Sequence, residues 1–319
     1  MNSISRILSI AAGLSLPLFA AATYSYDAAG RLVIVTYANG STISYTYDKA
    51  GNLLSRSMTS AATPAPSILP GGIVNAASYA AVPVAPGSLV AIFTSPLSAQ
   101  PAIFTTATLP SSLGGVGVTF NGIAAQMVQV VPTGAYPFVS AQVPFEVLAP
   151  GQTSATVLVV ITANNVPSAP VQTQIVASSP GIFTIPATGQ GNAILVNLAD
   201  YSIAALSGSI PGLTSHPIPR GQSAFFYVTG LGAMTPSVAD GSGSCPAASG
   251  LCNANAQPTV FVGGVQAPVV FAGQAAGFPG VMQVNITVPQ NAPTGSSVSL
   301  VVKSADGTVI SNAATVAVQ

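Results

Sequence analysis

The sequence predicts an all-β protein with two tandem antiparallel β-sandwiches, preceded by a small β-hairpin unit. Three observations lead to this prediction. From Gly71 onward, runs of four to eight Val, Ile, Phe, Thr and Ala residues alternate with turns rich in Gly, Pro, Asn and Ser. One succession of such runs occurs twice, beginning at Pro86 and again at Arg220. No stretch combines a 3.6-residue apolar period with helix caps, and closely spaced short strands are typical of sandwiches.

The duplicated stretch sets the boundaries of the two sandwiches. In each copy a turn pair separates two strands, Asn121-Gly122 in the first and Gly263-Gly264 in the second. Such pairs form tight hairpins with positive φ, so Gly122 and Gly264 should occupy equivalent turns. We therefore expect one sandwich over residues 71–178 and the other over residues 179–319.

The composition argues against several classes of function. Charged residues make up 4% of the 319 residues, against roughly 25% in an ordinary soluble protein, and the net charge is zero. Nucleic acid binding needs Lys and Arg to contact phosphates, so no nucleic acid partner is expected. A basic amphipathic membrane helix is not expected for the same reason. A nearly uncharged surface lacks the repulsion that keeps copies apart, which favours association.

The first 22 residues are typical of an export signal. Arg6 supplies the positive charge, residues 7–20 form an apolar run broken by Pro17, and Ala20-Ala21-Ala22 offers a small-residue cleavage site. The run is short for a spanning helix, and a buried helix or a membrane anchor is the alternative. We therefore predict a secreted or cell-surface protein with no membrane span after residues 1–22 are removed.

Residues 23–57 carry two copies of one short motif. The segment that begins at Tyr24 recurs 21 residues later, beginning at Tyr45. In each copy two tyrosines on one face of a strand precede an Asp, whose side chain caps backbone amides, and a Gly that takes positive φ. The motif residues are Tyr24, Tyr26, Asp27, Gly30, Tyr45, Tyr47, Asp48 and Gly51.

The paired motif resembles the YD repeats of Rhs and teneurin-like proteins, in which many copies coil into a large β-shell. Two copies are too few for a shell, because repeats of this kind usually need about three to bury a core. Between the copies, Asn39-Gly40 predicts a hairpin turn. The alternative is a marginal N-terminal hairpin. Residues 58–70, rich in Ser, Thr, Ala and Pro, are predicted to form an extended linker.

A further set of short motifs runs through residues 71–319. The set comprises Ile73-Val74-Asn75-Ala76-Ala77-Ser78-Tyr79, Pro86-Gly87-Ser88, Ala141-Gln142-Val143-Pro144, Pro180-Gly181-Ile182-Phe183, Gly189-Gln190-Gly191 and Gln283-Val284-Asn285-Ile286-Thr287-Val288-Pro289. Together these motifs look like an uncharacterised domain, named for Solibacter, that closes many exported Acidobacteria proteins. The resemblance implies Ig-like modules of the IPT/TIG kind and brings no catalytic residues. One departure is Thr94-Ser95-Pro96-Leu97, where the second copy has the Gly-rich turn Thr229-Gly230-Leu231-Gly232.

No catalytic, metal or cofactor site is expected from the sequence. The single histidine, His216, could form a hydrolase triad with Asp200 or Asp240 and a serine, but no Gly-x-Ser-x-Gly elbow accompanies it. A histidine on a surface loop is the alternative. The six Asp and Glu residues contain no close pair, so the sequence gives no support to a glycosidase dyad.

The two cysteines, Cys245 and Cys252, are predicted to form a disulfide, because an exported chain meets an oxidising compartment. Two free thiols on a mobile loop are the alternative. The bond would stiffen the loop from Met234 to Ala256, which is the best candidate for a recognition surface. A loop with no binding role is the other possibility for this segment.

These features favour an exported, non-catalytic module for adhesion or assembly at the cell surface or in the extracellular matrix. Its partner would be a protein or a glycan, and a second copy is one candidate, because edge strands with few charges do little to prevent strand addition. The alternative function is a carbohydrate-binding module, although Trp is absent and the tyrosines cluster in the repeat unit. A hydrolase is the third.

Overall fold

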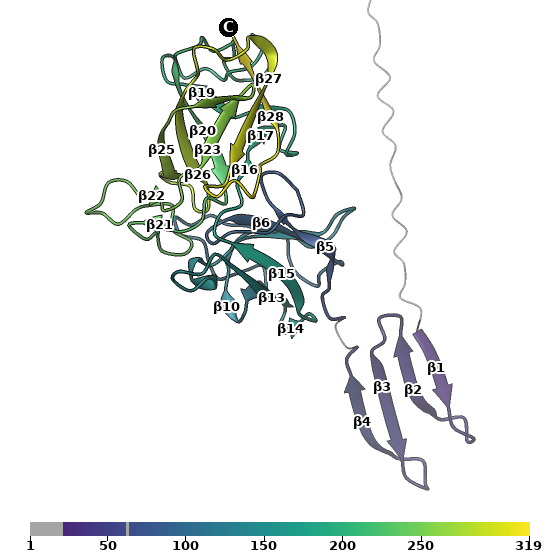
Figure 1. The fold of residues 1–319 in the computed structure, drawn as a ribbon. Coiled ribbons are helices and arrows are strands. Elements are labelled where there is room, and N and C mark those ends of the chain that lie inside the picture. The colour runs from purple at the N-terminus through teal and green to yellow at the C-terminus, as the bar shows by residue number, and fades with distance from the viewer. Residues whose placement is uncertain (1–21, 62–63) are drawn as a thin grey trace, which may run out of the picture. The chain divides into compact units, whose positions relative to one another are not determined.

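The computed structural model describes residues 22–61 and 64–319. They form two compact units, one up to residue 63 and one from Pro64 onward (Figure 1). The all-β prediction is confirmed: within the described residues the only helix is a 3-10 turn, Phe145–Val147. The export signal predicted over residues 1–22 lies, except for Ala22, outside the described residues.

The N-terminal unit is a single four-stranded antiparallel sheet in the order β1-β2-β3-β4. Its strands are β1 (Ala22–Tyr26), β2 (Leu32–Tyr37), β3 (Thr42–Tyr47) and β4 (Leu53–Thr59). The predicted hairpin around Asn39-Gly40 is its centre, β2–β3, and the structure adds a strand on each side. The outer strands form because the Asp–Gly turn of each motif also reverses the chain, which allows β1 to pair with β2 and β4 with β3.

The linker predicted over residues 58–70 is too long at both ends. Strand β4 continues to Thr59, which pairs with Thr42. The next unit begins with β5 (Ile68–Asn75), and Ile68 pairs with Thr94. Backbone pairing at these positions overrides a composition rich in Ser, Thr and Pro.

The first sandwich consists of two antiparallel sheets. One sheet has the order β5-β6-β12-β11-β7, and the other is built around β10-β9-β13-β14, with β15 paired to β13 and β8 to β9. The remaining strands are β6 (Leu89–Thr94), β7 (Ala102–Ile103), β8 (Ser112–Leu113), β9 (Val116–Phe120), β10 (Ile123–Ala124), β11 (Gln126–Val131), β12 (Phe138–Gln142), β13 (Ser154–Ala163), β14 (Val166–Pro167) and β15 (Val171–Val176).

The second sandwich is also built from two sheets. One has the order β16-β20-β26-β25-β22-β21, with β19 paired to β20, and the other has the order β17-β18-β28-β27-β23-β24. Its strands are β16 (Gly181–Ile182), β17 (Thr184–Ile185), β18 (Asn192–Ala193), β19 (Leu195–Asn197), β20 (Ser223–Thr229), β21 (Met234–Thr235), β22 (Asn253–Ala254), β23 (Thr259–Val262), β24 (Val265–Ala267), β25 (Val269–Gln274), β26 (Met282–Thr287), β27 (Gly295–Lys303) and β28 (Ala314–Val318).

The two sandwiches share one topology. The order β5-β6-β12-β11 corresponds to β16-β20-β26-β25, and β9-β13-β15 corresponds to β23-β27-β28. This division of seven strands into four and three is that of Ig constant-type domains, which confirms the predicted Ig-like pair. Gly122 and Gly264 lie in the corresponding hairpins β9–β10 and β23–β24, each with a φ of 81°. The sequence repeat is therefore a structural repeat.

Each sandwich has its own core. Side chains that point between the sheets alternate with outward-facing ones, as the burial patterns of β9 and β26 show. The first core surrounds Phe120 and Met127, and the second surrounds Phe226 and Met282. Two separate cores mean that the angle between the sandwiches must be fixed by contacts other than a shared interior.

The connection between the sandwiches packs tightly against the Gly-rich turn that follows β20. Both Gly230 and Gly232 have positive φ, and a Cβ at either position would overlap a carbonyl oxygen of the connection, that of Ser179 or of Ala177. At the corresponding turn of the first sandwich, the Ser95 N–H donates to the Ser67 carbonyl of the segment that leads into β5, at 2.9 Å, and Thr94-Ser95-Pro96-Leu97 makes this contact without a glycine. The Gly-rich turn is therefore required by the close approach of the connection between the sandwiches, which explains the departure seen in the sequence.

Replacing Gly232 by Ala should destabilise the pair of sandwiches by about 3 kcal/mol. A left-handed backbone costs an L-residue about 1–2 kcal/mol, and forcing the carbonyl of Ala177 aside adds about 1–3 kcal/mol. The matched control is Gly250→Ala, a position with φ of 67° and no atom near the new Cβ. The free energy of unfolding, measured with urea, should fall in the control only by the cost of the left-handed backbone. An equal fall in both variants would contradict tight packing at the junction.

Candidate functional site

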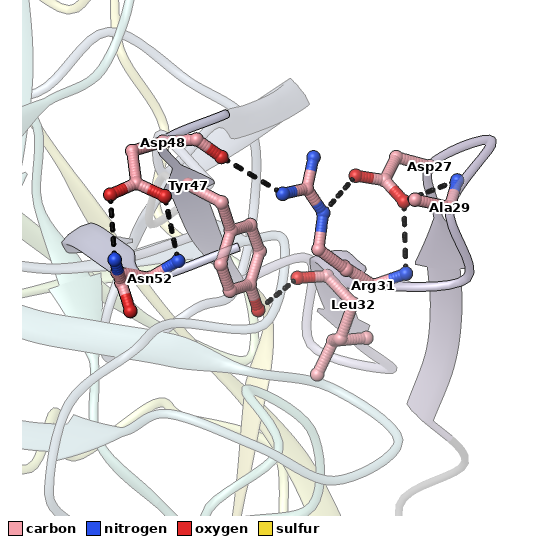
Figure 2. Close-up of polar contacts among 7 residues, drawn as sticks. All are labelled: Asp27, Ala29, Arg31, Leu32, Tyr47, Asp48 and Asn52. Carbon is pink, nitrogen blue, oxygen red and sulfur yellow. Dashed lines mark hydrogen bonds and ion pairs between the residues drawn. The ribbon is translucent and has the colours of Figure 1, made fainter. Parts of the chain in front are cut away.

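The two YD motifs form equivalent turns at one end of the N-terminal sheet (Figure 2). In the first, the Asp27 carboxylate accepts hydrogen bonds from the backbone N–H and the Nε of Arg31, at 2.9 and 2.7 Å. In the second, the Asp48 carboxylate accepts from the backbone N–H and the Nδ2 of Asn52, both at 2.8 Å. Gly30 and Gly51 follow with positive φ. Each motif Asp thus closes a turn by holding the residue four positions later.

Arg31 ties the first motif to the second. Its Nη1 donates to the Asp48 carbonyl at 3.0 Å, and its guanidinium lies 5.0 Å from the centre of the Tyr47 ring. The Tyr47 hydroxyl in turn donates to the Leu32 carbonyl at 2.8 Å (Figure 2). The hydrogen bonds from Arg31 lower the pKa of Asp27, and the bonds from Asn52 lower that of Asp48. These motif residues therefore have a structural role in fixing the sheet.

One face of the N-terminal sheet is mainly apolar, interrupted by Arg56, and the other is mainly polar, interrupted by Ile34. Side chains paired across the strands share a face, and one such row is Tyr24, Val35, Ile43 and Met58. The neighbouring row, on the opposite face, is Thr23, Thr36, Thr42 and Thr59. The alternation is that of a sheet with one solvated face and one face that is meant to be covered.

The outer strands leave much of the apolar face exposed. Val35 and Ile43, in the two central strands, are buried. In the outer strands Tyr24 and Met58 are 58% and 64% exposed, and Leu54 is 66% exposed. Exposed apolar side chains grouped in this way mark interaction surfaces more often than scattered ones do.

A cleft of about 1090 Å³ lies between the two sandwiches. One wall is the segment that follows β12 of the first sandwich, from Phe145 and Glu146 to Gln152. The other wall comes from the loop between Met234 and Asn255 of the second sandwich. The loop that the sequence singled out thus lines a cavity, and Glu146 is the one charged residue in the cleft lining.

The disulfide anchors this loop. Cys245 is bonded to Cys252, as predicted, with their Cα atoms 5.8 Å apart. Cys252 is fully buried in the core of the second sandwich, and Cys245 packs against the same core. Strands β21 and β22 at the ends of the loop pair with each other, and Asn253 pairs with Gly273 of β25. The loop is therefore an extension of the sheet.

Asp240 and Glu146 form a carboxyl pair at the cleft, although they are far apart in sequence. The Asp240 carboxylate also accepts a hydrogen bond from the Phe145 N–H at 3.0 Å, which joins the two sandwiches. Burial raises the pKa of Asp240 to about 6, the Phe145 N–H opposes this, and the neighbouring Glu146 adds to the rise. The sequence shows no close acidic pair, so this site was missed.

His216 is paired with Asp200, one of the partners considered from the sequence. Its Nε2 lies 2.7 Å from an Asp200 oxygen, and its Nδ1 lies 3.0 Å from the Pro217 carbonyl oxygen. Both contacts are to acceptors, so the protonated imidazole makes both hydrogen bonds at once, and these bonds raise the pKa of His216. The Ser202 hydroxyl donates to Asp200 and not to the imidazole. No nitrogen is left to activate a serine, so this arrangement is not a hydrolase triad.

Across residues 22–61 and 64–319, no three His, Cys, Asp or Glu side chains gather closely enough to hold a metal ion. In the same residues there is no helix with the length and apolar character needed to cross a membrane.

Comparison with known families identifies only the N-terminal unit. A family model described as RHS Repeat matches residues 20–42 and 26–64, in agreement with the predicted YD motifs. No curated protein matches the chain. The Solibacter-type resemblance of residues 71–319 stays a prediction.

Three solved structures match this chain with low similarity. SGBP-B of the Bacteroides ovatus mixed-linkage glucan utilization locus, in complex with a mixed-linkage heptasaccharide, is 9% identical over 91% of this chain, with a TM-score of 0.30. A surface glycan-binding protein from Prevotella bryantii is 13% identical over 78% of the chain, with a TM-score of 0.23. A titin tandem is 9% identical over 73% of the chain and 61% of its own length, with a TM-score of 0.20. The chain spans 54% and 42% of the two glycan-binding structures.

The stability of the paired sandwiches should fall as the pH rises from about 4 to about 6. The folded state holds the Asp240 proton with a pKa of about 6, above the ordinary 3.8, so deprotonation favours the unfolded state in this window. Allowing for partial exposure, the loss attributable to Asp240 should be about 1–2 kcal/mol.

The variant Asp240→Asn isolates this effect because it keeps the acceptor for the Phe145 N–H but cannot ionise. The free energy of unfolding is measured with urea at pH 4 and at pH 7. Between these two pH values the wild type should lose about 1–2 kcal/mol relative to the variant. A difference independent of pH would show that Asp240 is ionised throughout and that the carboxyl pair is not coupled.

Proposed function

We propose that the mature chain is an exported, non-catalytic module that acts in adhesion and assembly at the cell surface or in the extracellular matrix. The observation that carries the proposal is the exposed apolar face of the N-terminal sheet, the row from Tyr24 to Met58. A sheet with one apolar face normally packs it against a second layer. Within its own unit of the chain this sheet has only one layer.

The second layer is the apolar face of another copy. Two such sheets can stack face to face at the usual sheet spacing, and a two-fold arrangement presents the same surface to itself. The Asp27 carboxylate is paired with Arg31 and the Asp48 carboxylate accepts from Asn52, so both are held within the turns. Arg56, which is the cross-strand partner of Tyr45, is the charged side chain on the face itself. Pairing at the free edges, β1 and β4, is the other route to assembly and would use backbone groups only.

A second candidate function, carbohydrate binding, is favoured by a different observation. Phe225, Tyr227 and Phe271 lie in register with the amides of Gln283 and Asn285 on the outer face of one sheet of the second sandwich. Phe183 and Phe278, from the adjoining loops, line a hollow beside Tyr227. This surface is separate in sequence from the N-terminal sheet, so the two functions are compatible in one chain.

The assembly proposal predicts that Tyr24→Ser together with Met58→Ser weakens self-association of the mature chain by about tenfold or more, because the contact would lose two buried apolar side chains. Sedimentation velocity over a wide range of concentration measures the change. The matched control is Thr23→Ala together with Thr59→Ala, on the same outer strands but the opposite face.

Two results would contradict the proposal. One is a mature wild-type chain that stays monomeric at the highest concentration reached. The other is equal association of both double variants, which would assign the contact to the strand edges. Deleting residues 22–61 should leave both sandwiches folded, because they form a separate compact unit.

A further inference from the structure

The outer face of the sheet formed by β20, β26 and β25 carries aromatic and amide side chains in register. Phe225 and Phe271 are the cross-strand partners of Asn285, one on each side. In the next row of the same face Tyr227 and Gly273 flank Gln283. The intervening residues of β26 point into the core, so this face presents amides between rings rather than a plain apolar surface.

Three of the rings are in contact and form an aromatic platform, with planes inclined by 76° between Phe225 and Tyr227 and by 55° between Tyr227 and Phe278. The centres of Phe225 and Tyr227 are 5.6 Å apart, and those of Tyr227 and Phe278 are 6.1 Å apart. A shallow hollow of about 270 Å³ adjoins Tyr227 and Phe278, with Phe183 and Val281 in its lining. Phe278 is 54% exposed although it is a large apolar side chain. The platform is therefore open to a ligand at the end that Phe278 forms.

The amide pair beside the rings is polar but uncharged. The Gln283 Nε2 donates to the Asn285 Oδ1 at 2.7 Å. This bond leaves the Asn285 Nδ2 as a donor and the Gln283 Oε1 as an acceptor for another molecule. The face thus offers a donor and an acceptor side by side, next to aromatic surface, and its two rows contain no Asp, Glu, Lys, Arg or His.

We propose that this face binds a neutral glycan chain, which gives the carbohydrate-binding function proposed above a defined surface and ligand class. A sugar ring has an apolar face that can lie on an aromatic ring, and its hydroxyls both donate and accept, as the amide pair requires. A purely apolar protein segment would cover the rings but leave the amides without partners, at a cost in free energy. The absence of charge in the two rows favours a neutral glycan over an acidic one.

The test uses the mature wild-type chain and soluble neutral polysaccharides with different backbones: a mixed-linkage β-glucan, a galactomannan, a xyloglucan and a starch. Affinity electrophoresis identifies a polysaccharide that retards the protein, and titration calorimetry with its oligosaccharides measures the affinity. Phe278→Ala and Asn285→Ala should each weaken binding by about tenfold or more, since one removes stacking surface and the other a donor. Phe278 lies outside the strands, so this variant should remain folded.

The matched controls are Tyr136→Ala and Tyr201→Ala, which remove tyrosines that are 78% and 72% exposed elsewhere on the sandwiches. They should bind like wild type. The proposal would be overturned if none of the polysaccharides retards the protein, or if wild type and Phe278→Ala bind with equal affinity. It would also be overturned if this face binds a protein and no glycan. Self-association through the N-terminal sheet is measured without glycan, so either proposal can fail while the other stands.

Discussion

The docking of the two sandwiches depends on a buried hydroxyl group. The Thr229 Oγ1 accepts a hydrogen bond from the Leu89 N–H of the first sandwich and donates one to the Gly280 carbonyl of the second, both at 2.8 Å. Thr229 is fully buried, so water cannot replace its hydroxyl as a hydrogen-bond partner of Leu89 and Gly280. An unsatisfied buried donor or acceptor costs about 1–3 kcal/mol, and hydrogen bonds are directional, so this contact permits one geometry.

Further buried polar groups repeat this arrangement along the junction. The Gln142 side chain of the first sandwich accepts from the Gly241 N–H of the second at 2.7 Å. The Asn75 amide donates to the Ser179 carbonyl of the connection at 3.2 Å. The cleft lies along this junction. The loop that forms its second wall is held at Gly241 by the hydrogen bond to Gln142 and at the buried Cys252 by the core of the second sandwich. The shape of the cleft is therefore a consequence of the docking, while the aromatic platform belongs to the second sandwich alone.

Local sequence signals were sufficient to predict the units of the fold. The Asp and Gly of each YD motif define a turn through contacts within a few residues, and Gly122 and Gly264 mark matching hairpins for the same reason. The repeat of strand runs predicted two sandwiches because both copies obey the same alternation. The outer strands of the N-terminal sheet could have been found by noticing that each Asp–Gly turn reverses the chain, as Asn39-Gly40 does.

The sites between distant segments could not be predicted in this way. Phe145 and Asp240 are 95 residues apart in sequence, and no periodic pattern links them. The amide pair of Gln283 and Asn285 is visible as an i, i+2 spacing, but its aromatic neighbours come from other strands, so only the register of the sheet brings them together. Contacts of this kind follow from docking and strand order, which a single sequence does not encode locally.

The most direct test of this account is the orientation of the two sandwiches in solution, measured by residual dipolar couplings of backbone amides in the mature chain. Directional hydrogen bonds through Thr229, Gln142 and Asn75 predict that couplings from both sandwiches fit one alignment tensor with the orientation described here. Two different tensors, one for each sandwich, would show independent motion and would contradict a fixed junction.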